Sequence, residues 1–282
     1  MYKILWVADF TSKEHKGGAQ RTNQIMIEYG KKHGYDIEML TGGSVVQSKT
    51  DYDMVILNNI TKWEKEFILE LVDSQPCIRY EHDYWVSDHF PELFKKVKHN
   101  IFLSPLHYKA VCKKVGYDIE NYSLVPSSVD NIRFKPKGEK EPNTVLWAGN
   151  FCKFKNSDGY IEFAKQNPNM KCYIAGWGAN IDDIKGVDNI KYLGELTTAE
   201  LIKEYQRCQY FFHKPIIYSE PFGRTVIESY YCGCSLLINE NIGAISWGWD
   251  FGNYEQIRKN TQSQFKFWKI IKNEIQASRN LE

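Results

Sequence analysis

The sequence predicts an α/β protein in which strands and helices alternate to form doubly wound parallel sheets. Short apolar runs that are typical of buried strands recur at residues 3–10, 54–57 and 144–150. Segments with helical periodicity, several of them ended by glycine, lie between these runs. A charged, proline-containing segment at 135–143 separates two halves with the same alternation. Because strands that alternate with helices favour parallel βαβ units, we expect two such domains.

Composition narrows the functional classes. The 282 residues are 43% hydrophobic and 15% aromatic, enough for one large domain or two modest ones, and the net charge of +1 gives no indication of a nucleic-acid partner. No run of 18 apolar residues predicts a membrane span, and the N-terminus runs directly into a strand rather than a signal peptide. The seven cysteines include no C-x-x-C pair, which favours reduced core thiols in a cytoplasmic protein.

The first half begins with the strand at 3–10, a polar loop at 11–21 and a helix at 22–34. Gly17 and Gly18 lie just before this helix. A glycine pair lets the backbone approach a ligand closely, and a helix N-terminus favours an anion. The alternative interpretation is a flexible loop.

A strand at 54–57, a helix at 61–74 and a strand from 76 to His82 and Asp83 follow. His82 falls at the carboxyl end of its strand, where ligands bind in open α/β sheets. Two other interpretations stay open: a packed histidine paired with Asp83, and a metal site that also uses Asp88 and His89.

The rest of the first half comprises a helix at 90–100, a strand at 100–105 and a helix at 106–117. These helices carry lysines that either form a solvated face or contact anionic lipid: Lys95, Lys96, Lys98, Lys113 and Lys114. We interpret residues 135–143 as an unstructured linker.

The second half starts with a strand at 144–150, a loop at 151–157 and a helix at 158–168. Lys155 in the loop could neutralise a diphosphate as a point charge. The next strand, at 170–178, ends in Gly176 and Gly178, a G-x-G that is weak evidence by itself. A short strand at 189–196 precedes a helix at 197–208, which starts with a capping box of Thr197 and Glu200.

The stretch from 211 to 247 is the most informative. A strand ends near Phe212, a turn spans 219–223, a helix spans 225–231, and a strand follows at 235–239. We place Pro221 in the first turn of the helix, where its missing N–H costs nothing. A helix start of this kind is a natural phosphate site. The residues that would form it are Pro221, Phe222, Gly223, Arg224 and Thr225.

Two carboxylates bracket this predicted phosphate site. Glu220 lies in the turn, and Glu228 lies about 9 Å further along the helix axis. This spacing suits a sugar ring at one carboxylate, a ribose at the other and a diphosphate between them. The alternative is an ordinary solvent-facing helix with two glutamates.

The segment resembles the E-x7-E region of retaining glycosyltransferases of family 4, which have the GT-B fold. The resemblance rests on Glu220, on Phe222-Gly223, on Glu228, on Gly233 and on the segment 241–243. Ser229 and Cys232 stand where family members usually have alanine. Three weaker matches support it: a GGAER-type loop with Gln20 in place of Glu, a P-x-x-V-D segment at 126–130, and an F-x-P continuation at 134–136.

The resemblance implies two Rossmann-like doubly wound parallel-sheet domains that face a cleft. Residues 1–136 would form the acceptor-side domain and 143–258 the nucleotide-sugar domain, with a helix at 259–282 packing back on the first domain. The implied reaction moves a sugar from a nucleoside-diphosphate sugar to an acceptor with retention, without a cofactor or a metal. The acceptor would be a glycan, a lipid-linked molecule or a small molecule, with peripheral membrane contact in the lipid case.

The resemblance also assigns roles to residues. Glu220, His82 and Lys155 would be catalytic. The donor would contact Gly17, Gly18, Asn150, Lys153, Lys155, Gly176, Pro221, Phe222, Gly223, Arg224, Thr225 and Glu228. One departure stands out, because family members carry Arg where this chain has Asn150. Either Lys153 supplies the second charge or the phosphate is held more weakly.

Two alternative functions follow from these residues. Asn150 suggests a nucleotide-sugar-binding partner subunit without catalysis, and the fold also suits an inverting transferase or an epimerase. A further motif, Asp51-Tyr52-Asp53, matches the metal-binding D-x-D of GT-A transferases. Here it precedes its strand, so we expect these carboxylates at the opposite edge of the sheet from His82.

Overall fold

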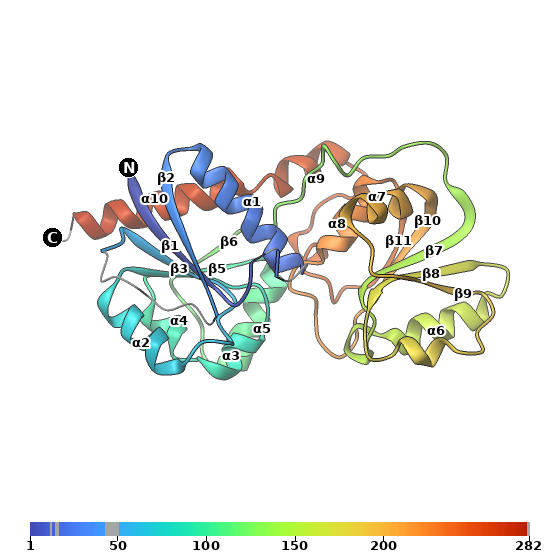
Figure 1. Cartoon of the computed structure of the whole chain (residues 1–282), viewed down its shortest axis with the longest axis horizontal. Coiled ribbons are helices and arrows are strands. Elements are labelled where there is room, and N and C mark those ends of the chain that lie inside the picture. The colour runs from blue at the N-terminus through green and yellow to red at the C-terminus, as the bar shows by residue number, and fades with distance from the viewer. Residues whose placement is uncertain (12, 15–16, 43–50, 281–282) are drawn as a thin grey trace. The chain divides into compact units, whose positions relative to one another are not determined.

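The computed structural model describes residues 1–11, 13–14, 17–42 and 51–280, and it divides into two compact units. Unit 1 comprises Met1–Ser128 and Lys259–Glu282, and unit 2 comprises Val129–Arg258. Each unit has one parallel sheet between helices (Figure 1). The predicted α/β class with two parallel sheets is therefore confirmed. Ser12, His15 and Lys16 of the predicted polar loop, and positions 281–282 of the predicted C-terminal segment, lie outside the described residues.

The sheet of unit 1 has the strand order β2-β1-β3-β4-β5-β6, and neighbouring strands are parallel. Its strands are β1 (Tyr2–Ala8), β2 (Tyr35–Thr41), β3 (Met54–Leu57), β4 (Cys77–Tyr80), β5 (His99–Phe102) and β6 (Tyr122–Leu124). The order reverses between β1 and β3, which makes the carboxyl ends of these two strands the topological switch point.

Helices cover both faces of this sheet. Successive residues of a strand point to opposite sides, and apolar residues of these strands therefore need cover on each side. Leu5 and Val7 of β1 belong to the apolar cluster that includes Ile68 of α2, whereas Trp6 packs against Phe267 of α10 with ring centroids 5.8 Å apart. Figure 1 shows α1 and α10 on one face and the remaining helices on the other. The helices are α1 (Gly18–Lys32), α2 (Lys65–Ser74), α3 (Trp85–His89), α4 (Leu93–Lys96), α5 (Pro105–Val115) and α10 (Gln264–Arg279).

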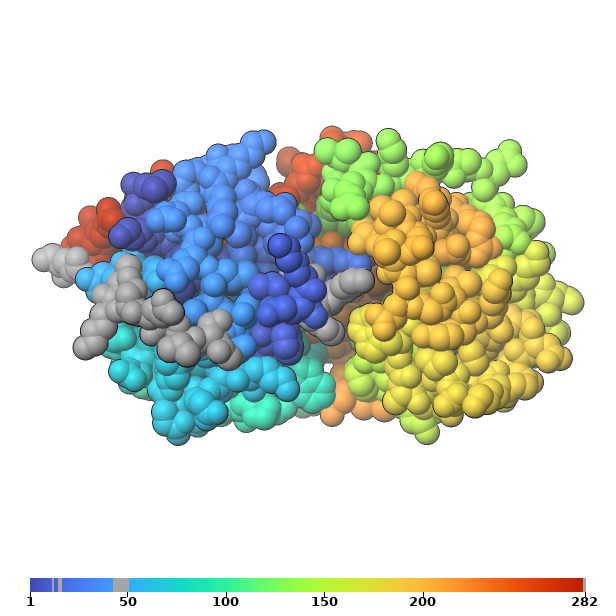
Figure 2. Space-filling model, viewed as in Figure 1, coloured from blue at the N-terminus to red at the C-terminus, as the bar shows by residue number. Residues whose placement is uncertain are grey.

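The last helix, α10, packs directly on α1. Trp268 donates from Nε1 to the carbonyl of Met26 at 2.9 Å. A Cβ at Gly30 would lie 2.2 Å from the Trp268 ring, so only glycine allows this approach. In the space-filling view, the red surface of the last helix lies beside the blue surface of the first residues (Figure 2). The two ends of the chain therefore share the core of unit 1.

The sheet of unit 2 has the order β11-β10-β7-β8-β9, again with parallel neighbours. Its strands are β7 (Glu141–Asn150), β8 (Lys171–Trp177), β9 (Ile190–Gly194), β10 (Cys208–His213) and β11 (Ser235–Ile238). Figure 1 shows α6 (Ser157–Gln166) on one face of the sheet, and α7 (Thr198–Arg207) and α8 (Arg224–Tyr231) on the other. Short 3₁₀ turns lie at Lys153–Lys155, Ile181–Ile184 and Ile245–Trp247, and α9 (Tyr254–Thr261) carries the chain back to unit 1. The switch point of this sheet lies between β7 and β10.

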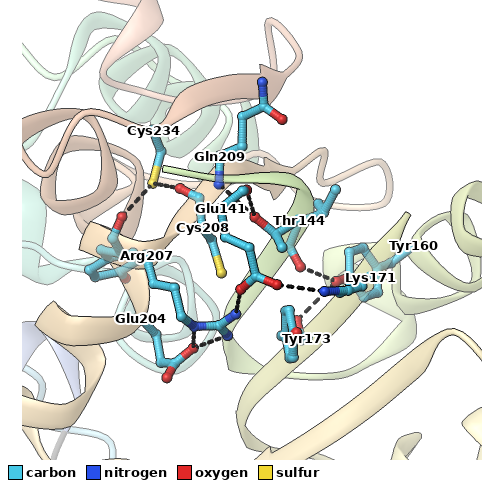
Figure 3. A network of polar contacts seen from close by, with 12 residues as sticks. Glu141, Thr144, Tyr160, Lys171, Tyr173, Glu204, Arg207, Cys208, Gln209 and Cys234 are labelled. Carbon is cyan, nitrogen blue, oxygen red and sulfur yellow. Dashed lines mark hydrogen bonds and ion pairs between the residues drawn. The ribbon is translucent and has the colours of Figure 1, made fainter. Parts of the chain in front are cut away.

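A polar network fastens the amino edge of the second sheet (Figure 3). Glu141 accepts from Lys171 Nζ at 2.7 Å and from Arg207 Nη1 at 2.6 Å. Thr144 Oγ1 accepts from the backbone N–H of Gln209 at 2.9 Å. The prediction that 135–143 is unstructured is thus wrong for its last three residues, because Glu141 starts β7 and is held by partners far along the chain.

Two other elements differ from the sequence-based prediction. The edge strand β2 was not predicted, because Asp36 and Glu38 interrupt its apolar pattern. Its Tyr35 packs on Trp268 with ring centroids 4.3 Å apart. The helix expected at 90–100 is confined to Leu93–Lys96, and β5 already begins at His99. Pairing with β4 therefore takes the last residues of the predicted helix into the sheet.

The D-x-D motif lies at the amino end of β3, where it ties structural elements together. Asp53 Oδ2 accepts from the backbone N–H of Lys3 at 2.7 Å, and Oδ1 pairs with Arg279 of α10. Asp53 thus links β1 to the last helix. Within the described ranges, no group of three or more His, Cys, Asp or Glu side chains is clustered as metal ligands.

Several of the clustered lysines are engaged within unit 1. Lys96 Nζ pairs with Asp73 at 2.7 Å, and Lys114 Nζ pairs with Asp88 at 2.6 Å. Lys95 lies 4.0 Å from the centre of the Tyr117 ring. Three of the five lysines thus have partners within unit 1. No helix in the described parts of the chain is both long and apolar enough to cross a membrane.

Candidate functional site

The predicted site residues of unit 2 lie at the carboxyl ends of β7 and β10, the two strands that flank the switch point. Asn150 is the last residue of β7, and His213 is the last residue of β10. The 3₁₀ turn Lys153–Lys155 follows β7, and the turn that carries Glu220 follows β10. Parallel sheets bind ligands at this edge.

The turn before α8 is fixed by a second segment. The backbone N–H of Glu220 donates to the carbonyl of Asn241 at 2.7 Å, and the N–H of Gly243 donates back to the carbonyl of Glu220 at 2.8 Å. The N–H of Ala244 donates to the carbonyl of Phe222 at 2.8 Å. Glu220 and Ile242 thereby form an isolated parallel bridge. This pairing explains why the segment 241–243 accompanies the glutamate motif in the sequence.

Gly223 forms the N-terminal boundary of α8. Its φ of +87° is in the left-handed region, and a Cβ there would lie 2.8 Å from Ile242 Cγ2. The helix begins at Arg224, so the prediction that Pro221 occupies its first turn is wrong. Phe222 is 2% exposed and packs near Trp249. Its burial keeps Phe222 and Gly223 in the turn, so the helix starts after them.

Two side chains meet at the Glu220 carboxylate. Its Oε2 lies 3.0 Å from Lys155 Nζ and 3.3 Å from His213 Nε2. The Lys155 and Glu220 side chains are 29% and 21% exposed, whereas that of His213 is 3% exposed. The structure thus brings together the two predicted catalytic residues of unit 2 and adds a histidine that sequence reasoning missed.

The charges of this cluster stabilise one another. Burial by itself would raise the pKa of Glu220, but the Lys155 ammonium and His213 outweigh it and hold this pKa well below its usual value. Burial would likewise lower the pKa of Lys155, and the Glu220 carboxylate outweighs it and raises this pKa. Glu220 is therefore an ionised hydrogen-bond acceptor at neutral pH.

The second glutamate is also held by a cation. Arg224 Nε and Nη2 lie 3.2 Å and 3.0 Å from Glu228 Oε1, one helical turn away. Glu228 is buried, with 1% of its surface exposed, so the alternative of an ordinary solvent-facing helix with two glutamates is wrong. Thr225 is half-buried beside them in the first turn of α8.

The remaining predicted residues of unit 2 lie along the same edge. Lys153 is exposed, whereas Lys155 of the same turn is half-buried and faces Glu220. Asn150 is half-buried and pairs with Trp177 in the ladder between β7 and β8. Gly176 has φ +141°, and a Cβ there would lie 2.1 Å from the carbonyl oxygen of Gly149. Only glycine therefore allows these two strands to end side by side.

The predicted residues of unit 1 lie at the carboxyl edge of its own sheet. His82 follows β4, is 8% exposed, and its ring centroid lies 4.3 Å from that of Tyr80. Gly18 is the first residue of α1, and Gly17 is its N-cap. Because Gly17 has φ −72°, its backbone conformation does not itself require glycine.

The residues on either side of His82 in the chain make polar contacts of their own. Asp83 accepts from Asn59 Nδ2 and from the backbone N–H of Trp85, the latter at 2.8 Å. Burial and the neighbouring Glu81 raise the pKa of Asp83 to about 7. Glu81 itself pairs with Arg79, and both side chains are almost fully buried. Asp83, at this carboxyl edge, therefore changes its protonation near neutral pH.

Sequence reasoning missed His213 although a signal was present. It is the only histidine between residues 129 and 258, and it ends a strand that precedes the glutamate turn. A polar residue at the carboxyl end of a parallel strand is a ligand candidate in the same way as His82.

The two-unit architecture is that of the GT-B glycosyltransferases. Sucrose-phosphate synthase from Thermosynechococcus elongatus has a TM-score of 0.73 at 14% identity, with 100% of this chain and 99% of that chain covered. HepE from Anabaena, solved with UDP and glucose, has a TM-score of 0.67 at 15% identity and the same coverage. AviGT4, a glycosyltransferase involved in avilamycin A biosynthesis, has a TM-score of 0.70 at 12% identity, with 98% and 99% covered. At these identities the likeness establishes the fold.

A family match falls on the second unit. Residues 128–246 match the family described as glycosyl transferases group 1, and this range contains Lys155, His213, Glu220 and Glu228. Among curated protein sequences, none matches this chain. The matched range covers 119 of the 282 residues, so the similarity to group 1 glycosyl transferases is established for the second unit and not for the first.

Proposed function

We propose that the protein is a retaining glycosyltransferase that moves a sugar from a nucleoside-diphosphate sugar to an acceptor hydroxyl. The observation that carries this proposal is the cluster of Lys155, His213 and Glu220 at the switch point of unit 2. It combines an ionised carboxylate and an ammonium group beside the start of α8, within the segment that matches group 1 glycosyltransferases. We assign the donor to unit 2 and the acceptor to unit 1.

The donor would lie along the carboxyl edge of the unit 2 sheet. Glu220 accepts hydrogen bonds from hydroxyls of the sugar, and Glu228, held by Arg224, accepts from the ribose. The diphosphate lies at the start of α8, where Gly223 caps the helix without a side-chain hydrogen bond. UDP is the first nucleotide to test, because the structure of HepE contains UDP and glucose.

In this proposal Lys155 neutralises the diphosphate of the donor. Its ammonium group has three N–H donors on a flexible chain, so it can turn from Glu220 toward the phosphate oxygens. As the bond from the anomeric carbon to the phosphate oxygen breaks, negative charge grows on the leaving diphosphate, and the fixed charge of Lys155 stabilises it. The acceptor oxygen bonds to the same face of the anomeric carbon, and its proton passes to the leaving diphosphate.

Catalysis in this scheme needs no divalent metal, because Lys155 and the helix start supply the positive field. Transfer should then proceed in excess EDTA at close to the untreated rate. Loss of activity in EDTA that manganese restores would contradict the metal-free mechanism. Gly17, Gly18 and His82 of unit 1 remain candidates for ligand contacts, and Asn150, Lys153 and Gly176 for contacts with the donor.

A thermal-shift screen against nucleoside diphosphates and their sugars tests the assignment of the ligand. A ligand at one hundred times its dissociation constant should stabilise the protein by about 2.7 kcal/mol. Proton NMR of the product of any donor that binds gives its anomeric configuration. Retention supports the proposal, whereas inversion would indicate a different mechanism on the same fold.

A second candidate is a nucleotide-sugar-binding subunit without catalysis, which Asn150 favours because it supplies no positive charge at the end of β7. Tight binding of a nucleotide sugar without transfer or hydrolysis by the purified protein would support this alternative.

A further inference from the structure

The histidine at the end of β10 is the fixed partner of Glu220. Its side chain is 3% exposed, and its ring centroid lies 6.1 Å from that of Trp147 and 6.3 Å from that of Phe211. The backbone of His213 pairs with Ile238 of β11. The ring therefore sits between aromatic side chains on a buried strand and has little freedom to move.

Lys155 is held differently. Its four-carbon chain is flexible, its side chain is 29% exposed, and it extends from a short 3₁₀ turn rather than from the sheet. Both groups contact the same oxygen, Oε2 of Glu220, at 3.0 Å and 3.3 Å. When a diphosphate binds, Lys155 can turn toward it, but His213 cannot.

We propose that His213 is a positioning residue for Glu220. Its ring donates from Nε2 to Glu220 Oε2 and keeps the carboxylate in place when Lys155 binds the diphosphate. This inference rests on the proposed function. Because Glu220 is an ionised acceptor, the hydrogen in the contact belongs to the histidine ring.

The consequence is a division of roles between the two carboxylate oxygens. Oε2 is occupied by His213 and Lys155, and Oε1 makes no hydrogen bond to the described protein groups. Oε1 is therefore the oxygen that accepts from the hydroxyls of the donor sugar. Since the Glu220 backbone is fixed by its bridge to Ile242, His213 sets the direction in which Oε1 points.

The first experiment tests the hydrogen bond between His213 and Glu220 in the ligand-free protein. Nitrogen-15 spectra of the histidine rings of the ligand-free protein at pH 7 report which ring nitrogen of His213 carries hydrogen, with His213→Gln identifying its signals. Hydrogen on Nε2 supports the proposal, and a ring protonated only on Nδ1 overturns it. This reading does not depend on any enzymatic activity.

The second experiment compares His213→Leu with His213→Gln, using UDP and UDP-glucose as probes. Leucine removes the donor, whereas glutamine keeps an N–H at a similar reach. We expect His213→Leu to lower the kcat for transfer or hydrolysis of UDP-glucose by about 10- to 100-fold, in line with one lost bond to a charged group. The Kd of UDP should change less than twofold, and His213→Gln should recover most of the rate.

Two outcomes overturn the positioning role. One is a wild-type rate in His213→Leu, and the other is an equal loss in both variants that follows an equal fall in Tm, which indicates packing alone. If the wild type neither binds UDP nor acts on UDP-glucose or the other nucleotide sugars screened, the proposed function fails, and a catalytic role of His213 fails with it. The ring spectra then still decide whether His213 holds Glu220.

Discussion

Replacing Lys155 by methionine removes the charge that faces Glu220 while keeping most of the side-chain length. The two groups are 3.0 Å apart, and their side chains are 29% and 21% exposed. Exposed ion pairs contribute about 0–1 kcal/mol, and breaking a buried pair costs about 3–5 kcal/mol. For this intermediate burial we expect Lys155→Met to lower the free energy of unfolding by about 2 kcal/mol, or the Tm by roughly 4–8 °C.

The effect should depend on pH. Lys155 helps to hold the pKa of Glu220 below its usual value, so the pair adds stability that is present above about pH 4.3, the ordinary glutamate pKa, and is lost as the pH falls through the lowered value. The difference between wild type and Lys155→Met should be full at pH 7 and shrink below about pH 4. Urea unfolding at several pH values measures it, with Lys165→Met, an exposed lysine on α6, as the control.

Lys155→Met should also weaken the binding of UDP by about 10-fold or more, as expected for one lost charge-assisted bond to phosphate. Calorimetry on the two methionine variants separates this effect from a general loss of positive charge. Equal stability and equal UDP affinity in Lys155→Met and Lys165→Met would refute the role assigned to the pair.

Three further predictions follow from the structure. Glu228→Gln should weaken UDP binding by about 10-fold through the ribose contact, as calorimetry can show, and an unchanged Kd would contradict this role. Gly223→Ala should lower stability to urea by about 2–4 kcal/mol, because it combines a φ of +87° with a contact at 2.8 Å, whereas Gly186→Ala, with φ +81° and open space, should cost only about 1–2 kcal/mol. Asp83 has a pKa raised to about 7, so it costs stability as the pH rises from about 4 to 7, and Asp83→Asn should flatten the Tm profile over that range. A Tm profile of unchanged slope would show that Asp83 does not titrate there.

The sequence was informative about the elements whose patterns are local. Alternating apolar runs and amphipathic segments predicted both parallel sheets, and the strand-turn-helix order placed Glu220 at a carboxyl edge. The strand β2 was missed because an edge strand with Asp36 and Glu38 lacks a continuous apolar run. The start of β7 has the composition of a linker, because the partners that neutralise Glu141 come from distant segments.

The contacts within the site were harder to predict. The loop position of Lys155 predicts a role at the diphosphate, but its contact with Glu220, 65 positions away, depends on how two strands of the sheet end side by side. The position of His213 at a strand end is a signal in the sequence, but its contact with Glu220 is not, because it requires the chain to reverse over seven residues. Pair contacts of this kind depend on tertiary structure rather than on a motif.

The most direct test of the proposed function compares wild type with Glu220→Gln and a control, Glu162→Gln, which changes an exposed glutamate on α6. Each protein is incubated with a nucleotide sugar that stabilises the wild type, and release of the nucleoside diphosphate is measured together with its Kd. We predict release by the wild type and by Glu162→Gln, and at least about 10-fold slower release by Glu220→Gln with the Kd retained. Equal release by all three proteins, or none by the wild type with any nucleotide sugar, would contradict the assignment of this site as a glycosyltransferase centre.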